Sequence, residues 1–396
     1  MILQAPNPGQ QFQTLGFGTF TSDPNGLISN PPVGALASLY ADGCIPLPYH
    51  PAANFRNLLD GGDFTVNPWQ RGAAFTGITN TATYTADRFA AVGGASSSIS
   101  VSKQANATVP GFSQALQFGR ANANANTAPI SLTQVIETAD SIRIQGHYLT
   151  FSFWATGGAN FSGTGLSVGV QYGTGTDQSL ANLIAGSWTA QAYPSMVPGS
   201  TTGTPGVAGL FGVGTPALQP ITTSPVRYTF TSAAQIPSGA TQAAVTVGYT
   251  PVGTAGANDW VQLQGLQLEL GAAVSPFEHR DAQVELEIAQ RYCWVTNEPA
   301  AGVIVATGGA VAAANAQVFY MAAPVQFRTA PTVTVVAGTF KVCAAAAAAA
   351  AAGIAAGTTH TVNAISINTT VTQTVGLAAT LQGGGGSGTI TASADF

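Results

Sequence analysis

Charged side chains are scarce in this sequence. The 396 residues include 11 Lys and Arg and 16 Asp and Glu, so 7 % of the chain is charged, against roughly 25 % in an ordinary soluble domain. The formal net charge is −5, and no cluster of basic residues occurs. Because binding to nucleic acid requires a basic surface patch, we expect no nucleic-acid partner.

Cysteine and histidine are also rare. The three cysteines, Cys44, Cys293 and Cys343, are odd in number and far apart, which fits neither a disulfide framework nor a zinc motif. The four histidines lie at motif distance neither from one another nor from a cysteine. The sequence therefore predicts no metal, no cofactor and no Ser-His-Asp triad, and we expect the cysteines to be buried thiols.

Long apolar runs are missing as well. No stretch of 18 apolar residues without breakers occurs, and the N-terminus lacks the basic start and apolar core of a signal peptide. We therefore expect no membrane insertion. A chain of this composition without an export signal would fit a protein that leaves its cell by assembly into a particle. Small uncharged residues dominate the chain instead, which suits a surface packed against copies of itself. A neutral extracellular coat is the alternative.

Glycine and proline, at 47 and 23 residues, divide the chain into short segments. Eight segments between about residues 57 and 278 alternate apolar and polar side chains, which is the period of a β-strand. They span residues 98–104, 114–120, 130–137, 148–155, 166–172, 226–231, 243–249 and 260–270. Without intervening helices, they favour an antiparallel β-sandwich, specifically a jelly roll, with a long loop inserted at 190–225.

The patterns divide the chain into four parts. Residues 1–54 form an N-terminal segment with a short helix over 33–41, and residues 55–280 form the jelly roll. Residues 281–295 predict a linking helix with Asp281 as its N-cap. Residues 296–396 form a second, smaller β-rich domain, so the fold class is mainly β.

Two low-complexity stretches lie in the last domain. The nine alanines at 344–352 are compatible with a helical turn or with a closely packed strand, and both possibilities stay open. The glycine-rich stretch at 383–388 predicts a flexible linker or a loop tip before a final strand.

Several strings, taken in order, resemble a module of bacteriophage tail-fibre and other virion proteins. They read NLLDGGDF (57–64), WQRG (69–72), YTADRF (84–89), FSFWA (151–155), QLELG (267–271), PFEHR (276–280) and QRYC (290–293). FRTAPT (327–332) is similar to β-rich domains that often follow this module. The sequence departs from the family at Asp60, Ala289 and Cys293.

The resemblance implies a jelly roll similar to carbohydrate-binding modules, carried in homotrimers on the outer surface of a phage particle. The N-terminal segment also looks like small virion-associated proteins, which implies that residues 1–54 attach the chain to other virion proteins. The last domain would then trimerise or contact the host, with a host-surface glycan as a further partner.

Acidic residues offer few pairs for catalysis. A polysaccharide hydrolase needs two carboxylates across a cleft. Asp60 and Asp63, beside two glycines, are weak candidates for binding calcium, and a turn that bonds its own backbone is the favoured interpretation. We therefore expect no catalytic residues.

The other acidic pairs are interpreted as structural or solvated. Glu137 with Asp140 falls at a strand end, and Glu285 with Glu287 lies on the linking helix. We expect all four side chains to face solvent.

Arginines occur together with acidic residues in the family strings. Arg71 and Arg88 accompany Asp63 and Asp87 there. This implies buried or rim ion pairs that hold the sandwich together.

Four tryptophans divide by their surroundings. Trp154 and Trp260 lie in apolar strands and are expected in the core. Trp69 and Trp188 lie near turn-rich sequence, which makes them the candidates for stacking on a glycan.

Together, these features predict a structural subunit of a phage virion. It would be a tail or capsid fibre or spike used in host adsorption, and not an enzyme. A free-standing glycan-binding protein is the main alternative, and a capsule depolymerase with carboxylates contributed across subunits is the third.

Overall fold

The computed structural model of the chain describes residues 56–106, 108–194, 196–198, 217–312, 316–336, 338–344, 347–350, 354–370 and 378–396, together with four short strands before residue 29. The chain separates into two units, Met1–Arg56 and Asn57–Phe396. In the first unit, β1 (Leu3–Gln4) pairs with β4 (Leu27–Ile28), and β2 (Gln11–Thr14) pairs with β3 (Gly18–Thr21). The helix predicted over 33–41 and Cys44 lie outside the described residues.

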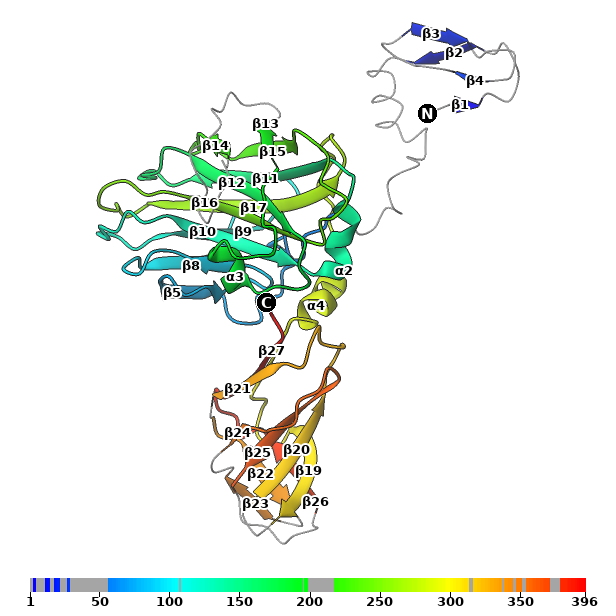
Figure 1. Cartoon of the computed structure of the whole chain (residues 1–396). Helices are drawn as coiled ribbons and strands as arrows, with labels where there is room; N and C mark the ends of the chain where they lie inside the picture. The colour runs from blue at the N-terminus through cyan, green and yellow to red at the C-terminus, as the bar shows by residue number, and fades with distance from the viewer. Residues whose placement is uncertain are drawn as a thin grey trace. The chain divides into compact units, whose positions relative to one another are not determined.

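The second unit begins with a sandwich of two antiparallel sheets (Figure 1). Six strands form one sheet, in the order β14-β12-β16-β10-β7-β6, and seven form the other, in the order β13-β15-β11-β17-β9-β8-β5. Their bounds are β5 Ala74–Ile78, β6 Thr83–Tyr84, β7 Ala90–Val92, β8 Ile99–Ala105, β9 Gln114–Arg120, β10 Ile130–Ile136, β11 Leu149–Gly157, β12 Leu166–Gly173, β13 Met196–Pro198, β14 Ala217–Gln219, β15 Val226–Ser232, β16 Gln242–Tyr249 and β17 Trp260–Leu270.

The connections follow a jelly roll. From β9 to β17 the chain changes sheet at every step, so consecutive strands face each other across the core instead of pairing. Alternate side chains point into that core, as Phe151, Phe153 and Ala155 do from β11. The predicted mainly β fold class is confirmed, and all eight predicted strands occur within two residues of their expected bounds.

Helices are short and few in the described part of the second unit. They are α2 (Thr138–Ser141), η1 (Ile142–Ile144), α3 (Leu180–Ile184) and α4 (Ala282–Gln290). The Asp281 carboxylate accepts a hydrogen bond from the Gln283 amide at 2.8 Å, so the predicted N-cap is confirmed. Among the described helices, none combines the length and the apolar character needed to span a membrane.

The last part of the chain forms two further antiparallel sheets (Figure 1). Their strand orders are β18-β27-β21 and β23-β22-β26-β19-β20-β25-β24. The strands are β18 Cys293–Asn297, β19 Ile304–Ala312, β20 Ala316–Ala322, β21 Thr332–Val336, β22 Lys341–Ala344, β23 Ala347–Ala350, β24 Ala355–Ala356, β25 Ala364–Thr369, β26 Ala378–Gln382 and β27 Thr389–Ser393. A separate apolar core includes Phe319, Phe340 and Leu381.

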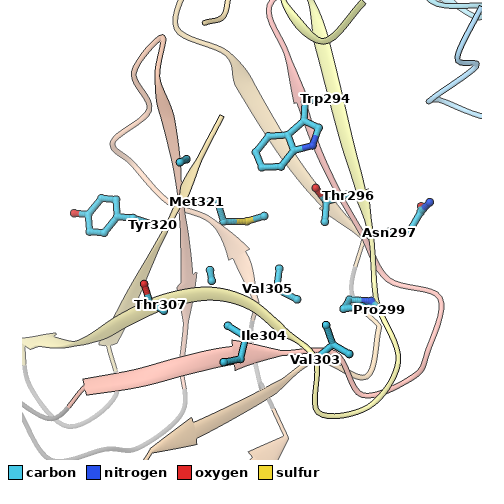
Figure 2. Close-up of a pocket in the computed structure, with 12 residues that line it drawn as sticks. Trp294, Thr296, Asn297, Pro299, Val303, Ile304, Val305, Thr307, Tyr320 and Met321 are labelled. Carbon is cyan, nitrogen blue, oxygen red and sulfur yellow. The ribbon is translucent and has the colours of Figure 1, made fainter. Parts of the chain in front are cut away.

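The two low-complexity stretches take defined places in this domain. Ala344 of β22 pairs antiparallel with Ala347 of β23, so the described alanines form strand and not helix. The glycine-rich residues 383–388 connect β26 to β27 as a loop tip. A hollow of about 590 Å³ lies beside β18, β19 and β20 (Figure 2).

The glycine-rich loop is bound by one buried carboxylate. Glu298 accepts hydrogen bonds from the amides of Thr339, Gly384 and Gly388 at 2.8–3.0 Å. Burial alone would raise the pKa of Glu298, but these backbone hydrogen bonds lower it to about 2.

The pH dependence of folding should report this contact. A lowered pKa in the folded state adds stability above the ordinary value of 4.5, and that stability is lost as the pH falls toward about 2. We expect the Tm of the full chain to fall over this range, and Glu298→Gln to lower the Tm at neutral pH and flatten the acid slope. Thermal unfolding from pH 2 to 7 tests this, and an unchanged slope in the variant would refute it.

Candidate functional site

The two tryptophans predicted to stack on a glycan are inside the protein. Trp69 is 6 % exposed, and its indole nitrogen donates to the carbonyl of Phe64. Trp188 is 3 % exposed, and its indole nitrogen donates to the carbonyl of Ser179. Because both rings are packed against protein, neither offers a free face for a sugar. The predicted glycan-stacking role of Trp69 and Trp188 is therefore wrong.

The two calcium candidates are occupied by protein groups. One carboxylate oxygen of Asp63 accepts from the Thr65 amide at 3.0 Å, and the other contacts His279 at 2.8 Å. Asp60 pairs with Arg88 at 3.1 Å. Asp63 thus bonds the backbone of its own turn, as the favoured interpretation expected, whereas Asp60 pairs with an arginine distant in sequence. Within the described residues, no group of three or more His, Cys, Asp or Glu could hold a metal ion.

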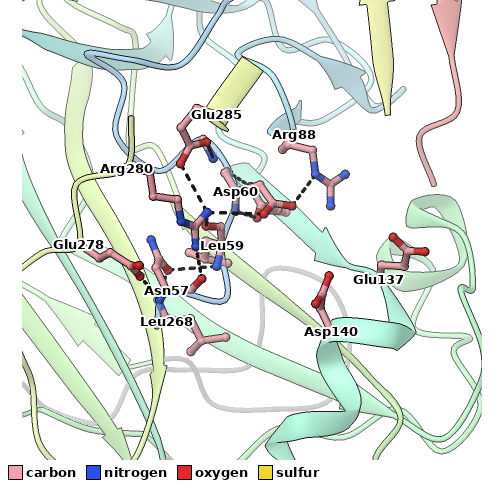
Figure 3. Close-up of polar contacts among 12 residues, drawn as sticks. Asn57, Leu59, Asp60, Arg88, Glu137, Asp140, Leu268, Glu278, Arg280 and Glu285 are labelled. Atoms are coloured by element: carbon pink, nitrogen blue, oxygen red, sulfur yellow. Dashed lines mark hydrogen bonds and ion pairs between the residues drawn. The ribbon is translucent and has the colours of Figure 1, made fainter. Parts of the chain in front are cut away.

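The first residues of the second unit, from Asn57 onward, belong to a buried polar cluster (Figure 3). The backbone amide of Asn57 donates to Glu278, and the Asn57 side chain bonds the backbone of Leu266 and Leu268 on β17. Arg280 donates to the carbonyls of Asn57 and Leu59. These contacts bind the opening string to the last strand of the sandwich.

Glu285 belongs to the same cluster and does not face solvent. It is 4 % exposed, accepts from the Gly61 amide at 2.8 Å and contacts Arg280 at 3.4 Å. Burial raises its pKa to about 7, although the Arg280 charge lowers it. The predicted solvated face of the helix is therefore wrong for Glu285, whereas Glu287 is exposed.

A second set of contacts joins the sandwich to the chain after α4. Arg88, 1 % exposed, donates to the carbonyl of Val135 at 2.8 Å, and its guanidinium lies 3.3 Å from the ring centre of Tyr292. Glu137 accepts from the Tyr292 hydroxyl at 2.9 Å and from Arg291 at 2.7 Å. Glu137 is thus 8 % exposed, and its predicted solvated position is wrong.

Asp140, three residues after Glu137 in the sequence, is exposed as predicted. Asp140 faces solvent and pairs with Arg143 at 3.2 Å, and their side chains are 53 % and 39 % exposed. The exposed pair is a useful contrast to the buried contacts, because exposed pairs contribute little to stability.

Arg71 extends the same set of contacts to the last strand. Arg71 pairs with Asp87 at 3.6 Å and with Asp395, while the Gln70 side chain donates to the Cys293 carbonyl at 2.7 Å. Burial raises the pKa of Asp87 to about 6. The predicted pairing of these arginines is confirmed for Arg71 with Asp87, whereas Arg88 pairs with Asp60. Hereafter the contacts of Arg71, Arg88 and Glu137 are called the seam.

Two of the three cysteines lie within the described residues. Cys293 is buried and Cys343 is half-buried, and both are free thiols. Burial raises the pKa of Cys293 to about 12, which keeps it protonated and unreactive at neutral pH.

The tryptophans expected in the core lie instead on the outer face of the seven-stranded sheet. Trp154 alternates with the core residues Phe153 and Ala155, and both Trp154 and Trp260 are half-buried. A methyl group at Gly158 would lie 2.8 Å from Trp260 Cε2, so this glycine lets the indole lie against the backbone.

Neutral polar side chains lie between the two rings and on the two neighbouring strands. Ser102, Gln117, Gln262 and Thr156 are register partners across four strands, and the Gln262 amide donates to Gln117 at 3.0 Å. From the register, Trp154 and Trp260 lie four residues apart along the strands, about 13 Å. Rings that accept the C–H face of a sugar, with amides between and beside them that both donate and accept, can bind a neutral glycan.

The sequence could not show this face because strand alternation does not tell which side meets solvent. The nearly strict alternation from Trp260 to Leu270 does place Trp260 and Gln262 on one face and Val261 and Leu263 on the other. The sequence signal for an outward position was therefore the polar residue two positions along the same face, such as Gln262 for Trp260, and not the apolar strand around the tryptophan.

Comparisons with known proteins give distant similarities. No family model and no curated protein matches the chain. Similar solved structures include the enzymatically active domain of bacteriophage CBA120 tailspike protein 4, with 12 % identity, a TM-score of 0.29, and coverage of 54 % of this chain and 21 % of that chain. A xylan-binding domain from CBM 22 has 16 % identity, a TM-score of 0.28, and coverage of 48 % and 90 %.

A tandem of CBM22 domains from Paenibacillus barcinonensis Xyn10C has 11 % identity, a TM-score of 0.27, and coverage of 82 % of this chain and 98 % of that chain. Similarities with such low TM-scores carry no argument about function. The functional interpretation therefore depends on the residues of this chain.

Proposed function

We propose that this protein is a structural subunit of a bacteriophage virion, a tail or capsid fibre or spike that adsorbs to glycan on the host surface. Residues 1–54 attach it to other virion proteins, and the chain acts without catalysis, as a homotrimer on the outer surface of the particle.

The observation that carries the proposal is the convergence of the virion-like strings. Residues from strings that begin at 57, 69, 84, 276 and 290 meet in the polar cluster and the seam. These positions, far apart in sequence, have two structural tasks. The polar cluster binds the opening string to β17 and α4, and the seam fixes a second β domain to the sandwich. A subunit that transmits load or position from a particle to a cell needs such a fixed junction.

A free-standing glycan-binding protein is the second candidate, and the outer face of Trp154 and Trp260 favours it. Both candidates use this face in the same way, since a fibre binds through many weak contacts whose avidity exceeds that of one site. They differ in whether the chain is found on particles.

Truncation of either ring tests the glycan-binding step that both candidates share. We expect Trp154→Ala and Trp260→Ala each to lower affinity for a neutral bacterial surface polysaccharide about tenfold, or about 1.4 kcal/mol. Isothermal titration of the full chain measures this, with the exposed Val252→Ala as control. Unchanged affinity in both folded variants would contradict this use of the face, and release of reducing ends would instead favour a depolymerase.

A further inference from the structure

The hollow in the last domain has the size of a ligand site. Its volume of about 590 Å³ falls within the roughly 300–1,000 Å³ usual for small-molecule pockets. Strands β18, β19 and β20 of this domain line it, with Trp294 toward one end, Tyr320 toward the other and Met321 between them (Figure 2).

One part of the hollow is aliphatic. Met321 and Ala306 are buried at 6 % and 5 % exposure, while Val303 and Ile304 at the margin are 49 % and 57 % exposed. Covering these two exposed side chains with an apolar group of a ligand would remove apolar surface from water, which is favourable. This part of the hollow favours an apolar group such as a methyl.

The remaining lining can hydrogen-bond. Thr296, Asn297 and Thr307 contribute neutral polar groups, and Trp294 and Tyr320 add an indole N–H and a phenol hydroxyl. In the part of the chain that the structure describes, none of these five side chains hydrogen-bonds another protein group. Their donors and acceptors are therefore available to a ligand.

Among the residues that the structure describes, no charged side chain lines the hollow. Glu298 follows Asn297 in the sequence, but its carboxylate is bound to the amides of Thr339, Gly384 and Gly388. Without a cation, the hollow has nothing to neutralise a carboxylate or phosphate, and a desolvated charge would be costly there. Sialic acid, uronic acids and phosphorylated sugars therefore do not fit.

We propose that this hollow binds a neutral sugar bearing a methyl group, an N-acetylhexosamine or a 6-deoxyhexose. The methyl group packs against Met321 and Ile304, and the hydroxyls bond Thr296, Asn297 and Thr307. The site rests on the proposed glycan-binding role and adds a second site to it, separate from the Trp154 and Trp260 face.

Saturation-transfer NMR on the full chain tests this site. Di-N-acetylchitobiose, L-rhamnose and D-glucose are the probes, so the arms separate the acetyl methyl from the 6-methyl group and include a sugar without a methyl group. We expect the strongest transfer at the acetyl or 6-methyl protons and about tenfold weaker affinity for glucose. Tyr320→Ala and Asn297→Ala should each weaken the preferred sugar about tenfold, whereas the exposed Val336→Ala should not.

Three outcomes would overturn the inference. The first is equal affinity for all three sugars, or no binding of any of them. The second is unchanged sugar binding in both Tyr320→Ala and Asn297→Ala. The third is a lower mass by light scattering for Ile304→Asp without loss of sugar binding, which would make the hollow a contact between copies of the chain. If Trp154→Ala alone abolishes glycan binding, the proposed function stands and this second site fails.

Discussion

Asp259→Asn should lower the free energy of unfolding by about 3–5 kcal/mol, because breaking a buried ion pair leaves an uncompensated charge. Asp259 and Arg120 are both fully buried side chains, 2.7 Å apart. Asp259 also accepts from the amide and hydroxyl of Ser162, and Arg120 donates to the carbonyls of Asn126 and Gly253 at 2.8 Å. The pair thus holds several loops at one end of the sandwich.

Denaturant unfolding of the full chain measures this loss. The matched control is Asp140→Asn, which removes the exposed pair with Arg143 and should cost less than about 1 kcal/mol. Equal losses in the two variants would show that burial of the Arg120–Asp259 pair does not decide its contribution.

Arg88→Ala should destabilise the seam by a similar amount, about 3–5 kcal/mol. The substitution removes the hydrogen bond to Val135, the ion pair with Asp60 and the stacking on Tyr292. Arg88→Lys keeps the charge but not the planar group that stacks, so we expect an intermediate loss.

Limited proteolysis gives a second measure of the seam. Because the seam fixes the last domain to the sandwich, Arg88→Ala should speed cleavage between α4 and β19 relative to the wild type and to Arg143→Ala. A stability and cleavage rate like those of the wild type would contradict a structural role for Arg88.

The strands were predictable from the sequence because their alternation is local. In β17, Val261 and Leu263 point to the core while Trp260 and Gln262 point away. The N-cap Asp281 was predictable for the same reason, since the side chain bonds an amide two residues away.

The errors at single residues came from partners distant in sequence. Glu285 bonds an amide 224 residues away and Glu137 a hydroxyl 155 residues away. Local sequence shows a strand end and a helix, but not the arginines and amides that replace water there. Trp69 and Trp188 were misplaced because turn-rich neighbours do not show which loops cover a ring.

The alanine run shows the limit of propensity. Alanine is the strongest helix former, yet Ala347–Ala350 pair with β22, which in turn pairs with β26. Pairing with a sheet already present decides the outcome, because tertiary contacts outweigh propensities of less than about 1 kcal/mol per residue.

The most direct test of the central claim is immunogold microscopy of gradient-purified phage particles from the culture that encodes this chain. The account predicts label on the outer surface of the particles, and loss of that label when residues 1–54 are deleted. Protein recovered only free in the medium, with unlabelled particles, would contradict a virion subunit and favour the free glycan-binding protein.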